Sequence, residues 1–317
     1  MRCRIASAVL CTFLWGCFPA QARQRAHPQG GLNRIGSRDL TKGDWDLYSP
    51  RREYKIGKSM AQQVEHLVTP LDDPLTRTYV QNLADRIVRH SDAKVPVDMK
   101  IIYSNEVDAF ALPGGFVFIT TGLILRTRSE AELAGVVARE VAYTAERDAT
   151  REMTQEAVLN WMSLPLLEYG GAAGFAIGGS IVMAEPLGSR VFNRRAEERA
   201  DFLGLQYLYK SGYDPEGYIN FFERVKRLEK VPRGIVARAF SPHSLIQRRI
   251  TAAEREIQKD LPARQEYVET TSAYQLMRER LDQIVRDQTT AVPRPVSKIP
   301  VLKKGFAARC SHPEDWR

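Results

Sequence analysis

The chain has 317 residues, which is enough for one large domain or two small ones, and 44% of them are hydrophobic. Its 46 lysines and arginines exceed its 38 aspartates and glutamates, for a formal net charge of +8. Because the basic residues are interspersed with acidic ones, the pattern argues against nucleic-acid binding and leaves a weak preference for anionic membrane surfaces open.

The first 22 residues have the pattern of an export signal. Arg2 and Arg4 precede a short apolar run, and residues 20–22 (Ala-Gln-Ala) form a small-x-small cleavage pattern. Residues 14–17 resemble a bacterial lipobox, so lipidation at Cys17 is the second interpretation. An uncleaved membrane anchor is the third, although the run is short for a span. We expect an exported protein, periplasmic or membrane-associated on the periplasmic side.

Residues 23–120 alternate between segments rich in turn-forming residues and segments with the apolar spacing of helices or strands. Residues 23–50 are rich in Gly, Arg, Asp and Pro and predict a flexible lead-in. Apolar spacing then predicts helical structure from about 53 to 90, interrupted at residues 72–74. Alternation predicts a strand over 97–103, and a second β-rich run follows the turn at residues 113–115.

A long helix is predicted from Ser129 to about Trp161. Ser129 and Glu132 have the spacing of a capping box, which satisfies free N–H groups in the first turn. The uncharged Gly/Ala-rich segment 169–184 follows and, at 16 residues, is short for a bilayer. We expect a buried helix or loop there, with a membrane-touching hairpin or a lid as the alternative.

Four further helices are predicted over about 195–211, 215–230, 244–260 and 266–287. From residue 289 the periodicity is lost, which is typical of a disordered tail. The predicted organisation is therefore a main domain over 51–262, a C-terminal helix over 263–288 and a tail over 289–317.

Residues 139–143 (Arg-Glu-Val-Ala-Tyr) stand where a zinc protease would carry His-Glu-x-x-His. In that motif two histidines, four residues apart on a helix, bind zinc, and the glutamate activates the metal-bound water. Here the base position is Glu140, but Arg139 and Tyr143 replace the histidines. A guanidinium has no lone pair for a metal, and a tyrosine titrates near pH ~10.

Four segments in order carry a family pattern: Asp108–Gly115, Glu130–Tyr143, Glu197–Asp201 and Ser241–His243. Together they resemble the membrane-associated zinc metallopeptidases that include HtpX, BepA and the CAAX prenyl protease, and most closely their exported bacterial branch. The resemblance covers roughly residues 45–260. It implies an α+β, mostly helical, zincin-like fold with a small β-sheet and a long active-site helix.

The resemblance also implies roles for individual positions. Glu197 matches the third zinc ligand, Asp201 a residue that supports the site, and Glu140 the general base, while Asp148 replaces a later histidine. The substrate cleft would be lined by an edge strand and the turn before it: Pro113, Gly114, Gly115, Phe116, Val117, Phe118 and Ile119.

A catalytic zinc ion needs about three protein ligands and an open position. The motif positions offer Glu197, and His243 could make a second. We therefore expect no metal and no cofactor. Instead, the guanidinium of Arg139 could stand where the zinc charge stood and form a bidentate pair with Glu197. The alternatives are that Arg139 extends to solvent, or that Glu140 pairs with Arg195 or Arg199.

These observations favour a catalytically inactive metallopeptidase homologue, a pseudopeptidase of the bacterial cell envelope. It would bind a peptide, an unfolded envelope protein or an active homologous protease by strand addition in the former cleft. The first alternative is an active zinc metalloendopeptidase with unconventional ligands such as Glu197, Glu140 and His243. The second is a structural envelope protein.

Overall fold

The computed structural model describes residues 31–41, 48–151, 153–154, 196–228 and 243–290. The predicted export signal, the 169–184 segment and the tail beyond residue 290 lie outside these ranges. Within the expected lead-in, residues 31–41 pack against the domain. Arg38 is buried, and its Nε and Nη2 atoms donate to Asp92 Oδ2 over 2.8 and 2.6 Å.

A three-stranded sheet forms the centre of the described domain. Its strands are β1 (Asp98–Ile102), β2 (Ala109–Leu112) and β3 (Phe116–Thr120), in the order β1-β3-β2. β1 runs parallel to β3, and β2 runs antiparallel to it. The prediction that Phe116–Ile119 form an edge strand is therefore wrong. All five β3 residues are buried, as expected for a strand covered on both faces, and the edges are β1 and β2.

The sharp turn between β2 and β3 is η2 (Pro113–Gly115), where Gly114 and Gly115 have φ values of 76° and 94°. These positive values favour glycine, since other residues meet a steric cost there. Helix α2 (Pro50–Leu67), capped by Ser49, packs on this turn. A Cβ on Gly57 would lie 1.7 Å from the Pro113 carbonyl oxygen, so only glycine allows this approach.

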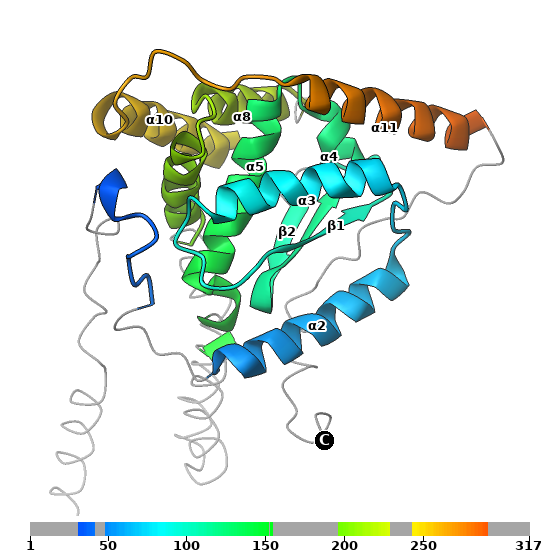
Figure 1. Cartoon of the computed structure of the whole chain (residues 1–317), viewed down its shortest axis with the longest axis horizontal. Helices are drawn as coiled ribbons and strands as arrows, with labels where there is room; N and C mark the ends of the chain where they lie inside the picture. The colour runs from blue at the N-terminus through cyan, green and yellow to red at the C-terminus, as the bar shows by residue number, and fades with distance from the viewer. Residues whose placement is uncertain (1–30, 42–47, 152, 155–195, 229–242, 291–317) are drawn as a thin grey trace, which may run out of the picture. The chain divides into compact units, whose positions relative to one another are not determined.

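Two apolar clusters fill the two faces of the sheet. Helices α3 (Pro74–Val88) and α5 (Glu130–Glu146) share one cluster with Val117 and Ile119. Helix α2 shares the other with Phe116 and Phe118. Successive β3 side chains thus enter opposite cores, as the strand geometry requires. Figure 1 shows α3 and α2 on opposite sides of the sheet, with α5 beside β2.

The remaining elements complete a mostly helical α+β domain, which confirms the predicted fold class. They are α4 (Thr121–Arg126), a helical segment over 196–210, α8 (Glu216–Leu228), α10 (His243–Asp260) and α11 (Ser272–Thr290). The last helix begins six residues later than predicted, at Ser272 rather than at residue 266. Of the helices in the described ranges, none is both long and apolar enough to cross a membrane.

Helix α5 ends earlier than predicted. Its last residue is Glu146, and Arg147 takes a left-handed conformation with φ 55° and ψ 35° before residues 148–151 turn helical again. The Arg147 side chain binds α2, where its Nε donates to the Glu53 carboxylate. This long-range ion pair accompanies a backbone conformation that costs energy for a residue with a side chain.

Candidate functional site

Helix α5 places the residues of the Arg-Glu-Val-Ala-Tyr segment inside the domain. Ser129 caps its first turn by accepting a hydrogen bond from Glu132 N at 3.2 Å. In a capping box, the Glu132 side chain would accept a hydrogen bond from Ser129 N. Here it accepts one from Arg128 N instead, at 2.8 Å, and it also forms an ion pair with Arg224. Almost every α5 residue is buried, so the helix is enclosed by protein on all sides, as helices in the core of a domain are.

The helical segment 196–210 lies very close to α5 at this position. A Cβ on Gly204 would come 2.9 Å from Arg139 Cα, so the two backbones approach more closely than a side chain would allow. This approach brings Glu197 and Asp201, which lie on the same segment, beside the Arg139 side chain. The predicted site residues of the two segments therefore meet in space.

Arg139 is the centre of a hydrogen-bond network and is only 6% exposed. Its Nη1 donates to Glu140 Oε1 at 2.9 Å and its Nε to Asp201 Oδ1 at 3.1 Å. Its Nη2 donates to Glu197 Oε2 and to the Tyr143 hydroxyl, the latter over 2.8 Å.

The expected contact between Arg139 and Glu197 is present, so the alternative in which Arg139 extends to solvent is wrong. The geometry differs from the expected bidentate pair, because the guanidinium divides its donors among three carboxylates. Such an arrangement satisfies several buried acceptors with one cation.

A second arginine, which the sequence analysis missed, reinforces this cluster. Arg249 of α10 binds Asp201 in bidentate fashion, with 2.6 Å from Nε to Oδ2 and 2.7 Å from Nη2 to Oδ1. Its Nη1 lies 3.6 Å from Glu197 Oε2, and its Cζ lies 4.1 Å from the Phe222 ring centroid. The sequence contained one indication that Arg249 is buried, namely its position beside Ile250 on the apolar face of an amphipathic helix.

Both arginines keep their charge at neutral pH. Burial acts to lower the pKa of Arg139, but the surrounding acidic groups, with Glu197 first, raise it well above its usual value. The pKa of Arg249 is also raised, because Asp201 outweighs the effect of burial. The site thus contains two fixed positive charges.

The acidic groups differ in their titration. Burial raises the pKa of Glu140 to about 7, although Arg139 opposes the shift. Burial raises the pKa of Asp108, the residue before β2, to about 7 as well. In contrast, Arg249 and Arg139 outweigh burial at Asp201 and lower its pKa. Near neutral pH, Asp201 is therefore ionised. Glu140 and Asp108 change between their protonated and ionised forms in this pH range.

A neighbouring cluster involves Asp148, at the position of the later family histidine. Arg199 donates to Glu146 and to Asp148 Oδ1, over 3.0 and 2.9 Å. One of the alternatives predicted that Arg199 pairs with Glu140. Arg199 pairs instead with Glu146 and Asp148, so this alternative is wrong. Arg195, the other alternative partner of Glu140, lies outside the described residues.

Zinc is the metal that the family resemblance implies, and the donors at these positions do not fit it. The guanidinium of Arg139 has no lone pair and lies among the carboxylates that would otherwise be free to coordinate. Burial raises the pKa of Tyr143 well above its usual value, which keeps the phenol protonated. In the described ranges, no group of three His, Cys, Asp or Glu residues is arranged to hold a metal ion.

His243 is the first residue of α10, and its side chain lies outside the described part of the structure. The residues expected to line a cleft, Pro113 to Ile119, are all buried, and those of η2 lie against α2. On the neighbouring edge strand β2, by contrast, Ala109, Phe110 and Ala111 are partly exposed.

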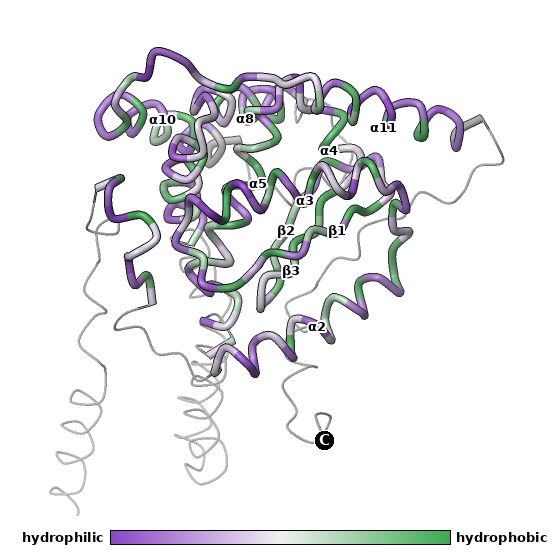
Figure 2. Tube along the Cα trace, in the orientation of Figure 1, coloured by the Kyte–Doolittle hydropathy of each residue, from purple (hydrophilic) through white to green (hydrophobic). Residues whose placement is uncertain are grey.

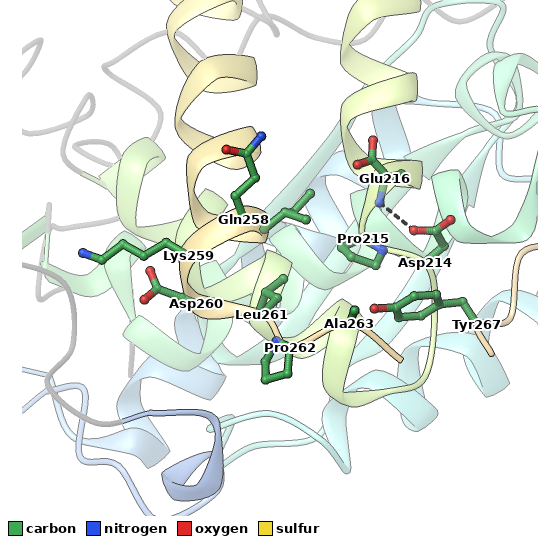
Figure 3. A pocket seen from close by; sticks show the side chains of 11 residues that line it. Asp214, Pro215, Glu216, Gln258, Lys259, Asp260, Leu261, Pro262, Ala263 and Tyr267 are labelled. Carbon is green, nitrogen blue, oxygen red and sulfur yellow. Dashed lines mark hydrogen bonds between the residues drawn. The ribbon is translucent and has the colours of Figure 1, made fainter. Parts of the chain in front are cut away.

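A pocket of about 480 Å³ lies elsewhere, between the start of α8 and the end of α10. Figure 3 shows its lining, with Asp214 accepting a hydrogen bond from the Glu216 backbone N at 2.9 Å. None of the residues of the Arg139 network lines it. The pocket is therefore separate from the candidate site.

Comparison with known proteins identifies the family. Residues 74–257, more than half of the chain, match the family described as Peptidase family M48. The chain belongs to this family. The matched range contains the sheet, α5 and the helix with Glu197 and Asp201, so the candidate site lies within the M48 domain.

Individual M48 relatives are similar at modest identity. The chain is 29% identical to the beta-barrel assembly-enhancing protease of Escherichia coli over 55% of this chain and 37% of that protein. It is 32% identical to the putative beta-barrel assembly-enhancing protease of Vibrio cholerae over 66% and 43%, respectively. The mitochondrial metalloendopeptidase OMA1 of Schizosaccharomyces pombe is 28% identical over 63% and 57%. The chain thus spans less than half of the first two relatives.

Proposed function

We propose that this M48 protein is a catalytically inactive metallopeptidase homologue that is exported to the cell envelope and binds peptide or protein partners. The observation that supports this proposal is the Arg139 guanidinium hydrogen-bonded to Glu140, Glu197 and Asp201. A fixed cation at this place balances part of the carboxylate charge, but it cannot supply the acidified water that a zinc protease uses.

Without that water, Glu140 has no nucleophile to activate, because bulk water is about nine pKa units less acidic than zinc-bound water. The Glu140 carboxylate is also engaged by Arg139 Nη1 at 2.9 Å. In the proposed function, Glu140 is therefore a structural partner of Arg139, and zinc belongs only to the alternative of an active metalloendopeptidase.

The proposed binding surface is the open edge of β2. The Asp108 carbonyl accepts a hydrogen bond from Thr120 N at 3.1 Å, which makes this a hydrogen-bonded pair of the antiparallel ladder. Because such pairs alternate, Ala109 and Ala111 turn their backbone N–H and C=O groups away from β3. An extended peptide could pair with these groups as an additional strand.

Metal analysis and a casein cleavage assay of the purified protein test the absence of catalysis. We expect no stoichiometric zinc and no cleavage above that of a Glu140→Gln variant. One zinc ion per chain together with cleavage that depends on Glu140 would establish the active-enzyme alternative instead.

A backbone substitution tests the binding surface. Ala111→Pro removes an N–H that points to the open edge and leaves the β3 ladder intact, since proline is tolerated at such edge positions. We expect weaker binding of unfolded model substrates such as reduced casein, while Ala111→Ser, which keeps the N–H, binds normally. Equal binding by the two variants would exclude the β2 edge as the binding surface, and no binding by the unsubstituted chain would favour the purely structural envelope protein.

A further inference from the structure

The first half of α2 exposes a group of cationic side chains: Arg51, Arg52, Lys55 and Lys58. Residues 51, 55 and 58 follow the i, i+4, i+7 spacing and so share one helix face, over about 10 Å. The acidic residue in this half of the helix, Glu53, is buried and paired with Arg147, so it does not neutralise the exposed face. Figure 2 shows hydrophilic residues predominating along α2.

An aromatic side chain lies among these cations. Tyr54 is 50% exposed, and its ring centroid lies 5.4 Å from that of Phe116, so one part of the ring packs on protein and the other meets solvent. The helix backbone at Tyr54 lies close to η2, because a Cβ on Gly114 would lie 2.7 Å from Tyr54 Cα. We call Arg51, Arg52, Tyr54, Lys55 and Lys58 the α2 basic surface.

The charges of this surface are available to an external partner. Within the described ranges, the side chains of Arg51, Lys55 and Lys58 form no ion pair. Arg52 stacks on the Tyr48 ring, with its Cζ 5.1 Å from the centroid, and so keeps its charge. By contrast, Lys100 on β1 is balanced by Glu65 and Asp98.

From this geometry we infer that α2 docks on a layer of anionic phospholipid headgroups, with Tyr54 at headgroup level. A cluster of cations on one helix attracts such a layer, and an amphipathic aromatic ring prefers the interface. The surface is the exposed side of a helix, so it offers neither the open strand edge nor the groove that peptides bound by strand addition or as helices need. This inference goes beyond the proposed function and uses none of its residues.

The test compares the full chain and two double variants in sedimentation with vesicles. Lys55→Gln/Lys58→Gln removes two charges from the α2 basic surface. Arg248→Gln/Arg255→Gln removes the same charge from exposed positions of α10. For each protein, binding to phosphatidylglycerol-containing vesicles is divided by binding to pure phosphatidylcholine vesicles. This ratio removes any contribution from insertion of the apolar N-terminal run into the bilayer, which both vesicle types allow.

We expect the Lys55/Lys58 variant to lower this ratio roughly 25-fold, because each cation near an anionic surface contributes about fivefold. The α10 variant should change it much less. Equal losses in the two variants would mean that net charge alone drives binding, which overturns the inference.

A second measurement locates the contact. A photo-reactive benzoylphenylalanine in place of Tyr54 should form phospholipid adducts on irradiation, whereas the same group in place of Leu276, which is 59% exposed on α11, should not. Equal adduct formation at both positions, or adducts of residue 54 with protein instead of lipid, would overturn the inference.

Discussion

Replacing Arg139 with methionine tests whether its guanidinium holds the candidate site together. Methionine keeps much of the aliphatic volume and removes the charge. Of the three carboxylates, Asp201 retains Arg249 as a partner, and the Glu197 side chain is 32% exposed and can be hydrated. Glu140, whose side chain is 3% exposed, loses the cation beside it.

Breaking a buried ion pair by removing one partner costs about 3–5 kcal/mol. Glu140 escapes part of this cost by taking up a proton, since burial already raises its pKa to about 7. We therefore expect a loss of about 3 kcal/mol in the free energy of unfolding at pH 8, and a smaller loss at pH 5.

Urea denaturation followed by circular dichroism measures this loss. With a slope of about 2 kcal/mol per molar urea, the midpoint should fall by about 1.5 M. Adding Glu140→Gln to the Arg139→Met variant should restore about 2 kcal/mol, because the two residues are in direct contact. Arg280→Met, which breaks a half-exposed pair with Asp73, is the control and should cost under about 1 kcal/mol. A loss below about 1 kcal/mol for Arg139→Met, or no rescue by Glu140→Gln, would refute the reasoning.

Three further outcomes are expected. The folded chain binds the Glu140 proton more tightly than the unfolded chain, with a pKa of about 7 against 4.5, so stability falls as pH rises through this window. The melting temperature should follow this fall, and Glu140→Gln should make it shallower without abolishing it, because Asp108 titrates in the same window; an unchanged pH profile contradicts the assignment. Arg139→His/Tyr143→His should bind about one zinc ion per chain by metal analysis, with Glu197 as third ligand, and a folded double variant without zinc would argue against this geometry. Gly204→Ala should cost about 1–2 kcal/mol in urea because its Cβ would lie 2.9 Å from Arg139 Cα, whereas Gly31→Ala, with open space around it, should cost under about 0.5.

The sequence predicts the contacts of this site that depend on helical spacing. Arg139 and Tyr143 lie four residues apart on α5, so both face the segment that contains Glu197, and the structure brings all three together. The fold class is predictable for a similar reason, because the period of apolar residues differs between helices and strands.

The order of strands in the sheet is not a local property, and here the sequence interpretation was wrong. The position of β3 between β1 and β2 depends on pairing between segments that are distant along the chain. One signal was present, since Phe116 to Ile119 are four consecutive apolar residues. Such a run is typical of a strand covered on both faces, which an edge strand of a small sheet seldom is.

The end of α5 shows a second limit. Arginine has no preference for a left-handed conformation, and no nearby glycine marks residue 147 as a stop. The ion pair between Arg147 and Glu53 joins residues 94 positions apart. A local pattern cannot reveal a helix end that accompanies so distant a contact.

The division of the Arg139 guanidinium among three carboxylates also limits which evolutionary steps are open to this chain. A histidine at position 139 alone would leave Glu140 without its cation and would bring one new ligand, which is too few for a catalytic metal. A histidine at position 143 alone would face a guanidinium that repels metal ions. A zinc-binding site therefore requires two substitutions, of which the first alone either lowers stability or adds no metal binding. Selection for stability or for metal binding would thus favour neither single step, and the arginine would be kept.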